Sequence, residues 1–279
     1  HKDDPENPEL KAHRIIEASE KEMLESVLEA DGDFTVSQTD RNATEKPPLN
    51  FDLTSLQREA NNLWSWSARR TLSVAQELYD THKLTTYPRT DSRFLPEDMM
   101  ESISKTIRQL GAQDKLNAHS QRLVDDGLKN VKRNFDNAKV SDHYAIIPTG
   151  KIPPGGLSAD ASKLYDLIAR QFLASFHPES IWKVEKRTVS KQGQNFVKEA
   201  RSLSTPGWRA VRPKKQNLPE GWGTLPANPG QATITSHEFK EEKTKPPGRL
   251  KEAGLLRLME HAGKKIDDED LAAAMKGKG

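Results

Sequence analysis

The pattern of apolar residues changes after His177-Pro178, and this change restricts the possible folds more than any other feature of the chain. Before it, apolar residues recur at helical spacing in residues 10–30, 54–63, 67–79, 96–110 and 161–175. After it, alternation and a high content of β-branched and aromatic residues predict strands at 181–190, 195–203, 207–211 and 230–239. A further short strand is predicted at 32–40. We therefore expect an α+β protein whose helices and antiparallel sheet come mostly from different parts of the chain.

Several helix boundaries can be predicted from capping residues. Thr54 is predicted as an N-cap with Gln57 at the third helical position, which is the capping-box pattern. Ser67 is predicted to cap the next helix. Further helices are expected at 251–264 and at 267–276. Residues 111–138 are polar, and their pattern leaves the type of structure open.

Composition limits the class of protein. Of 279 residues, 34% are hydrophobic and 30% are charged, so we expect two or three compact units with much surface relative to core. The net charge of +2 does not indicate a uniformly cationic nucleic-acid-binding domain, so any basic surface must come from local clustering. The absence of cysteine excludes disulfides, thiol nucleophiles and cysteine zinc sites. No apolar run approaches the roughly 20 residues of a membrane span, and we expect a soluble protein.

Tyr87 lies in an unusually polar setting, the sequence Thr-Thr-Tyr-Pro-Arg-Thr-Asp-Ser. A free phenol has a pKa of about 10, so it attacks a phosphorus centre only with help. Arg89 could donate to phosphate oxygens and stabilise developing charge, while Thr90 and Ser92 could donate to a DNA backbone and Asp91 could orient Arg89 or a water. A half-buried tyrosine in a turn, with the arginine in a surface ion pair, explains the same spacing. Spacing alone leaves both interpretations open.

Four segments resemble one family in the correct order. "LTTYPRTDSRFLP" (84–96) resembles the active-site segment of type IA DNA topoisomerases, specifically the topoisomerase III branch. "PPLNFDLTSLQREAN" (47–61) is similar to the segment that precedes this site. "AKVSDHYAIIPTG" (138–150) is similar to its second active-site segment, and "KTKPPGRLKEAGLLRLMEHAGK" (243–264) to a later one. Together these segments place most of residues 44–279 in the resemblance.

The resemblance implies a reaction. Tyr87 would attack single-stranded DNA and become joined to a 5′-phosphate, another strand would pass through the gap, and the free 3′-hydroxyl would reseal the break without ATP. Arg89 matches the family arginine beside the nucleophile, and His143 matches a histidine that contacts a DNA phosphate. The alternative function is a non-catalytic clamp for single-stranded DNA, or a structural arm from the same family.

Other candidate DNA contacts carry weaker arguments. Gln57, Lys245 and Arg249 could line or grip the DNA path, together with Thr90 and Ser92. A capping role also explains Gln57, and a solvated basic turn also explains Lys245 and Arg249. The five tryptophans could stack on bases, but we favour packing for each of them.

The resemblance also implies a division into domains. A helical tyrosine domain (47–179) is expected to be inserted into an antiparallel β arch built from 1–46 and 180–243, with a helical DNA-binding domain beginning at 244–279. Members of the family bind Mg²⁺ through acidic residues of a Toprim domain, and the resemblance does not include that domain. The acidic sequence Asp31-Gly32-Asp33 fits a turn better than a metal site. We therefore expect a central fragment, inactive alone, that needs its Toprim domain in cis. The expected location is the cytoplasm, with the nucleoid, and a helicase partner is left open.

Overall fold

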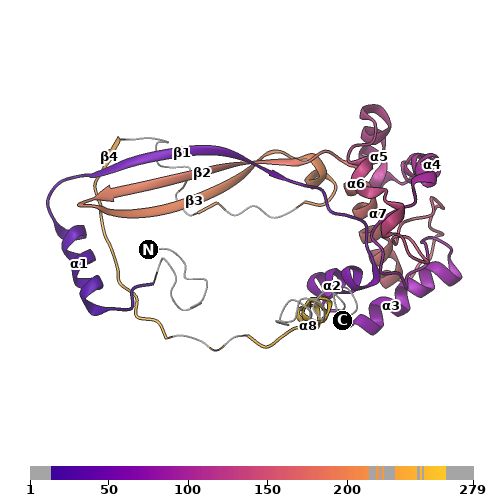
Figure 1. The fold of residues 1–279 in the computed structure, drawn as a ribbon, viewed down its shortest axis with the longest axis horizontal. Helices are drawn as coiled ribbons and strands as arrows, with labels where there is room; N and C mark the ends of the chain where they lie inside the picture. The colour runs from indigo at the N-terminus through magenta and orange to yellow at the C-terminus, as the bar shows by residue number, and fades with distance from the viewer. Residues whose placement is uncertain are drawn as a thin grey trace. The chain divides into compact units, whose positions relative to one another are not determined.

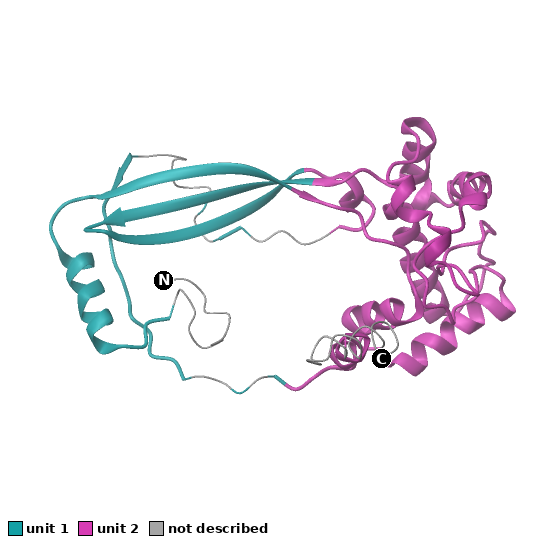
Figure 2. Cartoon of the chain, in the orientation of Figure 1, with its two compact units in different colours: residues 1–43, 181–204, 215–248 teal, residues 44–180, 205–214, 249–279 magenta. Residues whose placement is uncertain are grey.

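The computed structural model describes residues 14–213, 218–219, 222, 230–243, 246 and 248–261. The chain forms two compact units, coloured separately in Figure 2. Unit 1 comprises residues 1–43, 181–204 and 215–248, and unit 2 comprises 44–180, 205–214 and 249–279. The prediction of an α+β fold with an antiparallel sheet is confirmed. The helix predicted at 267–276 lies outside the described residues.

The sheet contains four strands in the order β3-β2-β1-β4 (Figure 1). Their bounds are β1 Phe34–Glu45, β2 Ser180–Lys191, β3 Gln194–Thr205 and β4 Gly230–Ala232. Gln192 and Gly193 join β2 to β3 with φ of 47° and 78°, as a two-residue hairpin with both central residues at positive φ requires. β1 pairs antiparallel with β4, Phe34 opposite Ala232. The sheet is therefore assembled from segments that lie far apart in sequence.

Lys191 joins the end of helix α1 (Ala18–Glu29) to the hairpin. The amine of Lys191 donates to the carbonyl of Ala30 and, at 2.9 Å, to that of Gly32. The same amine lies 4.6 Å from the centroid of the Phe34 ring, a cation–π contact. Lys191 therefore fixes the end of α1 next to the strands.

Three strand predictions need correction. β1 extends to Glu45, five residues past the predicted end. Within the predicted strand at 230–239, only Gly230–Ala232 forms one. The strand predicted at 207–211 is wrong, because Gly207–Ala210 is a 3-10 helix. Gly207 has φ of 49°, and a Cβ there would lie 2.2 Å from the carbonyl oxygen of Glu179, so close backbone approach decides this turn.

Unit 2 is helical. Its helices are α2 Leu53–Trp64, α3 Ala68–Gln76, α4 Met100–Leu110, α5 Asp114–Asp126, α6 Val131–Asn134, α7 Ala159–Phe176 and α8 Glu252–Glu260. A π-helical turn, Glu77–Thr81, follows α3, and 3-10 turns lie at Glu97–Met99 and Asn137–Lys139. Residues 111–138, whose pattern was ambiguous, thus contain two helices.

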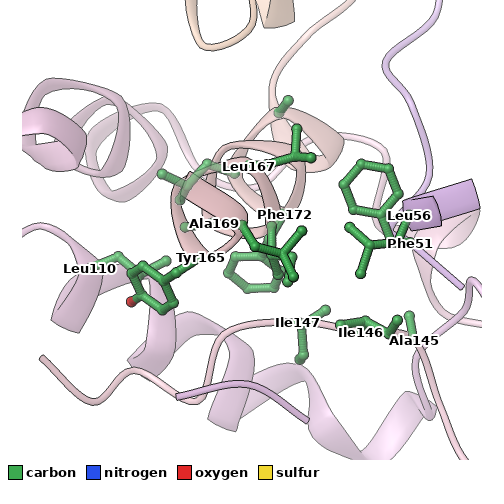
Figure 3. Packing of buried hydrophobic residues seen from close by; sticks show 14 of the residues in the cluster. Phe51, Leu56, Leu110, Ala145, Ile146, Ile147, Tyr165, Leu167, Ala169 and Phe172 are labelled. Carbon is green, nitrogen blue, oxygen red and sulfur yellow. The ribbon is translucent and has the colours of Figure 1, made fainter. Parts of the chain in front are cut away.

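The core of unit 2 surrounds α7. Leu164, Ile168 and Phe172 are fully buried, and the burial of each such side chain stabilises the fold by about 1.5–3 kcal/mol. Figure 3 shows Phe172 in the same cluster as Leu56 of α2 and Ile146. The segment that contains residues 145–147 is therefore held from within by apolar packing.

One predicted helix start is wrong and another is confirmed. Asp52, not Thr54, is the N-cap of α2, and its carboxylate accepts from the backbone N–H of Ser55 at 2.7 Å. Ser55 closes the capping box by accepting from the N–H of Asp52 at 3.1 Å, so Gln57 lies beyond it. Ser67 caps α3 as predicted, its hydroxyl accepting from the N–H of Arg70 at 3.1 Å.

Two segments pack differently from the predicted division into domains. Residues 205–214, assigned above to the arch, belong to unit 2, where Trp208 and Val211 join the core. Helix α8, assigned above to a further domain, packs on α2: Arg58 pairs with Glu260, and Asn61 accepts from the N–H of Ala253 at 3.1 Å. The division into an arch and a tyrosine domain itself stays a prediction. In the described ranges, no helix is long and apolar enough to cross a membrane.

Candidate active site

Two segments of unit 2 form the frame around Tyr87. The backbone N–H of Thr86 donates to the carbonyl of Ile147 at 2.9 Å, and that of Ala145 donates to Phe94 at 3.0 Å. The N–H of Ile146 in turn donates to the carbonyl of Phe51 at 2.8 Å. Segments 84–96 and 138–150, which each resemble an active-site segment of the family, are therefore hydrogen-bonded to each other although they lie about fifty residues apart in sequence.

Short polar side chains complete this pairing. The hydroxyl of Thr86 donates to the carbonyl of Ala145 at 2.9 Å, and that of Thr90 donates to the carbonyl of His143 at 2.9 Å. The hydroxyl of Ser92 donates to the carbonyl of Lys139 at 2.7 Å. Thr90 and Ser92 are only 6% and 4% exposed, so these hydroxyls are used inside the protein. Their predicted contact with DNA stays a prediction, and the structure gives them the separate role of joining the two segments.

The Tyr87 ring lies in a cluster of aromatic side chains. It is half-buried, and its centroid is 4.4 Å from that of the exposed His143 ring, with 46° between the planes. The ring of Tyr79 meets it edge to face, at 5.4 Å and 75°. Tyr144 lies beside this cluster, and burial, followed by the neighbouring Tyr79, raises the pKa of its phenol. Three of the four tyrosines in the chain therefore gather at this point.

Arg89 is exposed next to the cluster. When the amide oxygen of Gln76 is turned toward Arg89, it accepts hydrogen bonds from Arg89 Nε at 3.3 Å and from Arg89 Nη2 at 3.2 Å. The carboxylate of Asp91 accepts from the hydroxyl of Ser141 at 2.9 Å, and its predicted orientation of Arg89 stays a prediction. Since a guanidinium has five N–H donors, three remain for an anion.

The structure brings together only some of the predicted residues. Tyr87, His143, Thr90 and Ser92 form one contiguous group, and Arg89 adjoins it. Gln57 is 9% exposed, and its amide donates to the carbonyl of Ala68 at 3.1 Å, which joins α2 to α3. Arg249 is exposed just before α8, while Lys245 lies outside the described residues. The predicted DNA contacts of Gln57, Lys245 and Arg249 therefore stay predictions.

Sequence reasoning missed Gln76 and Tyr79. The helical spacing of apolar residues over 67–79 predicts an inward-facing position for Tyr79, and Gln76 carries no signal in the sequence. The rarity of tyrosine in this chain was the one available clue, since two of the four occur within nine residues.

Two other predictions concern the tryptophans and metal ions. Trp66, Trp208 and Trp222 are 4%, 5% and 8% exposed, which favours packing. Within the described part of the chain, no group of three or more histidine, aspartate and glutamate side chains could hold a metal ion.

The fold and the paired motifs match a known family. The family model for DNA topoisomerase matches residues 1–264, and the chain belongs to this family. Its relatives place it with the topoisomerase III branch of type IA, as predicted. It is 39% identical over 227 residues to DNA topoisomerase 3 of Bacillus licheniformis, with 79% of this chain and 31% of the relative covered. It is 35% identical over 243 residues to DNA topoisomerase 3 of Salmonella typhimurium, with 85% and 37% covered.

A solved structure supports the fold alone. Full-length topoisomerase I from Thermotoga maritima is 22% identical and superposes with a TM-score of 0.60, covering 94% of this chain and 42% of that one. The chain spans about a third of the length of the curated relatives it matches.

Proposed function

We propose that this chain supplies the nucleophile of a type IA DNA topoisomerase. Tyr87 Oη attacks a backbone phosphorus of single-stranded DNA, the bond from phosphorus to the 3′ oxygen breaks, and a phosphotyrosine forms on the 5′ side. The phenolic proton is lost and the 3′ oxygen gains one. After strand passage, the 3′-hydroxyl attacks the phosphotyrosine and restores the phenol. One phosphodiester replaces another at each step, so no ATP is consumed.

The observation that carries this proposal is the contact of the Tyr87 ring with an exposed imidazole, next to an exposed guanidinium. In this proposal His143, whose ring lies against that of Tyr87, donates to a phosphate oxygen beside the attacking phenol. Arg89 has donors left after its contact with Gln76, and a planar guanidinium suits the equatorial oxygens of phosphorus during attack. The catalytic roles therefore fall to Tyr87 and Arg89, and phosphate binding to His143.

In this proposal the remaining basic residues bind the DNA strand at a distance from the phosphate that Tyr87 attacks. Arg249 is exposed and free to contact a backbone phosphate, and Lys245 precedes it by four residues. Partial loss of such contacts weakens binding without affecting the chemical step.

Mg²⁺ belongs, in this proposal, to a Toprim domain outside these residues. The side chains described here do not provide a ligand set for it, so no step above depends on the metal. A helicase partner and a location at the nucleoid belong to the same proposal.

The proposal is tested by supplying the missing domain. This chain is mixed with a purified Toprim fragment from a topoisomerase 3 relative, Mg²⁺ and an end-labelled single-stranded oligonucleotide, and the denatured products are separated. A covalent adduct is expected with the wild type and with Tyr144→Phe, a matched change at a neighbouring tyrosine, but not with Tyr87→Phe. Identical traces for wild type and Tyr87→Phe would mean that the chain is a non-catalytic clamp.

Arg89→Ala separates catalysis from binding. Because Arg89 acts on charge that develops during attack, we expect adduct formation to slow by at least about a hundredfold while oligonucleotide affinity falls by only a few-fold. Affinity is measured by fluorescence anisotropy. Equal losses of rate and affinity would reduce Arg89 to a binding residue.

A further inference from the structure

The end of α3 supplies two side chains that touch the proposed catalytic residues. Gln76 is the last residue of α3, and Tyr79 lies three residues later in the π-helical turn Glu77–Thr81. Both are half-buried. Residues three apart on a helix lie on neighbouring parts of one face, and short π-helical turns frequently occur at functional sites.

Each of these side chains contacts a different catalytic group. With the Gln76 amide in the orientation that satisfies both of its polar atoms, its oxygen accepts two hydrogen bonds from Arg89, through Nε and Nη2. The Tyr79 ring meets the Tyr87 ring at 5.4 Å and 75°, within the preferred range for edge-to-face pairs. An arginine held at two nitrogens and a phenol held against a second ring both lose rotational freedom before any DNA is present.

The turn that carries Tyr79 is itself anchored. Leu78, next to it, is 0% exposed in the core of unit 2. The N–H of Leu84 donates to the carbonyl of Leu78 at 2.9 Å, and that of His82 donates to Glu77 at 3.2 Å. Lys83 takes φ of 54° to allow this exit. Its amine lies 5.2 Å from the centroid of the Tyr79 ring and restrains that ring from another direction.

We propose that Gln76 and Tyr79 are positioning residues, which set the orientation of the Arg89 guanidinium and of the Tyr87 ring for attack on a phosphate. This inference rests on the proposed function of Tyr87 and Arg89. It assigns no chemical step to either residue: their contribution is to hold the two catalytic groups in the attacking geometry. A displacement of about 1 Å at a reacting group can cost on the order of a hundredfold in rate.

The first test is made on this chain alone and needs no activity. Tyrosine is labelled with ¹³C at Cζ and arginine with ¹⁵N at Nε, and signals are assigned with single substitutions. We expect Tyr79→Leu to shift the Tyr87 signal and Gln76→Leu to shift the Arg89 Nε signal. The matched controls Phe239→Leu and Gln121→Leu, at residues far in sequence from the site, leave both signals in place. If the Tyr87 signal is unchanged in Tyr79→Leu and the Arg89 signal is unchanged in Gln76→Leu, the inference is overturned.

The second test measures the rate of adduct formation in the mixture with the Toprim fragment. Tyr79→Leu and Gln76→Leu are each expected to lower this rate about tenfold with unchanged oligonucleotide affinity. Tyr79→Phe keeps the ring and Gln76→Glu keeps the acceptor, so both should recover most of the rate. If the wild type forms an adduct and the leucine variants match its rate, the positioning role is wrong and the proposed function stands. If the wild type forms none, the proposed function fails, and the labelled signals still decide whether the contacts orient Tyr87 and Arg89.

Discussion

The hydroxyl of Thr90 offers the sharpest test of how the two active-site segments are held together. It donates to the carbonyl of His143 at 2.9 Å and accepts from the N–H of Ser92 at 3.1 Å. Thr90→Val keeps the shape of the side chain but removes both bonds. A net hydrogen bond contributes about 0.5–1.5 kcal/mol, and a buried N–H left unpaired costs about 1–3 kcal/mol. Water can replace the bond to the exposed His143, whereas it reaches Ser92 poorly at 4% exposed.

These contributions add to a loss of about 1.5–4.5 kcal/mol in the free energy of unfolding of unit 2. Guanidinium denaturation followed by circular dichroism measures this loss. Thr149→Val is the matched control, because its hydroxyl donates to the carbonyl of Lys83 at 2.8 Å in an exposed position, where we expect less than about 1 kcal/mol. Thr90→Ser keeps the hydroxyl and should recover most of the stability. If Thr90→Val proves as stable as Thr149→Val, the hydroxyl does not join the segments and the argument for Thr90 is wrong.

Two further predictions concern backbone geometry and pH. Gly207→Ala places a Cβ 2.2 Å from the carbonyl oxygen of Glu179 at φ of 49°, so we expect a loss of at least about 4 kcal/mol, measured by denaturation. The control Gly193→Ala has φ of 78° with no atom within 4 Å of the new Cβ and should lose only about 1–2 kcal/mol; equal losses would refute the argument from close approach. Burial lowers the pKa of His177 to about 4, from an ordinary 6.5. Because His177 binds a proton more tightly in the unfolded chain than in the folded one, its contribution to stability is fully present above pH 6.5. This contribution falls as the pH drops toward about 4. Denaturation across this range should show the fall in the wild type and much less of it in His177→Asn; parallel curves would mean that His177 does not titrate in this way.

The sequence predicted the large features of the fold because they depend on periodicity. Helical spacing located α4 and α7, and alternation located β2 and β3, since both patterns follow from burial of one face. Turns that depend on distant partners were missed. The segment at 207–211 has the composition of a strand, yet contact with the backbone at 178–179 makes it a 3-10 helix.

The candidate site shows the same limit. Its motif identified Tyr87, Arg89 and His143, which the structure places in one neighbourhood. The roles of Thr90 and Ser92 could not be derived locally, because their hydrogen-bond acceptors lie at His143 and Lys139, about fifty residues away. Tyr79 was likewise assigned to packing, because no local pattern predicts that a π-helical turn brings its ring against Tyr87.

The most direct measurement of the central claim uses a substrate with a good leaving group. A single-stranded oligonucleotide with sulfur in place of the bridging 3′ oxygen is added to the mixture of this chain with the Toprim fragment. Attack releases a thiolate, which needs no proton donor, so the reaction becomes trapped as a covalent product. Tryptic digestion then isolates residues 84–89, in which Tyr87 is the only tyrosine. Mass spectrometry should find a 5′-phosphorylated oligonucleotide on this peptide. Attachment to a peptide that carries Tyr79 or Tyr144 instead, or equal labelling of Tyr87→Phe, would contradict the assignment of Tyr87 as the attacking group.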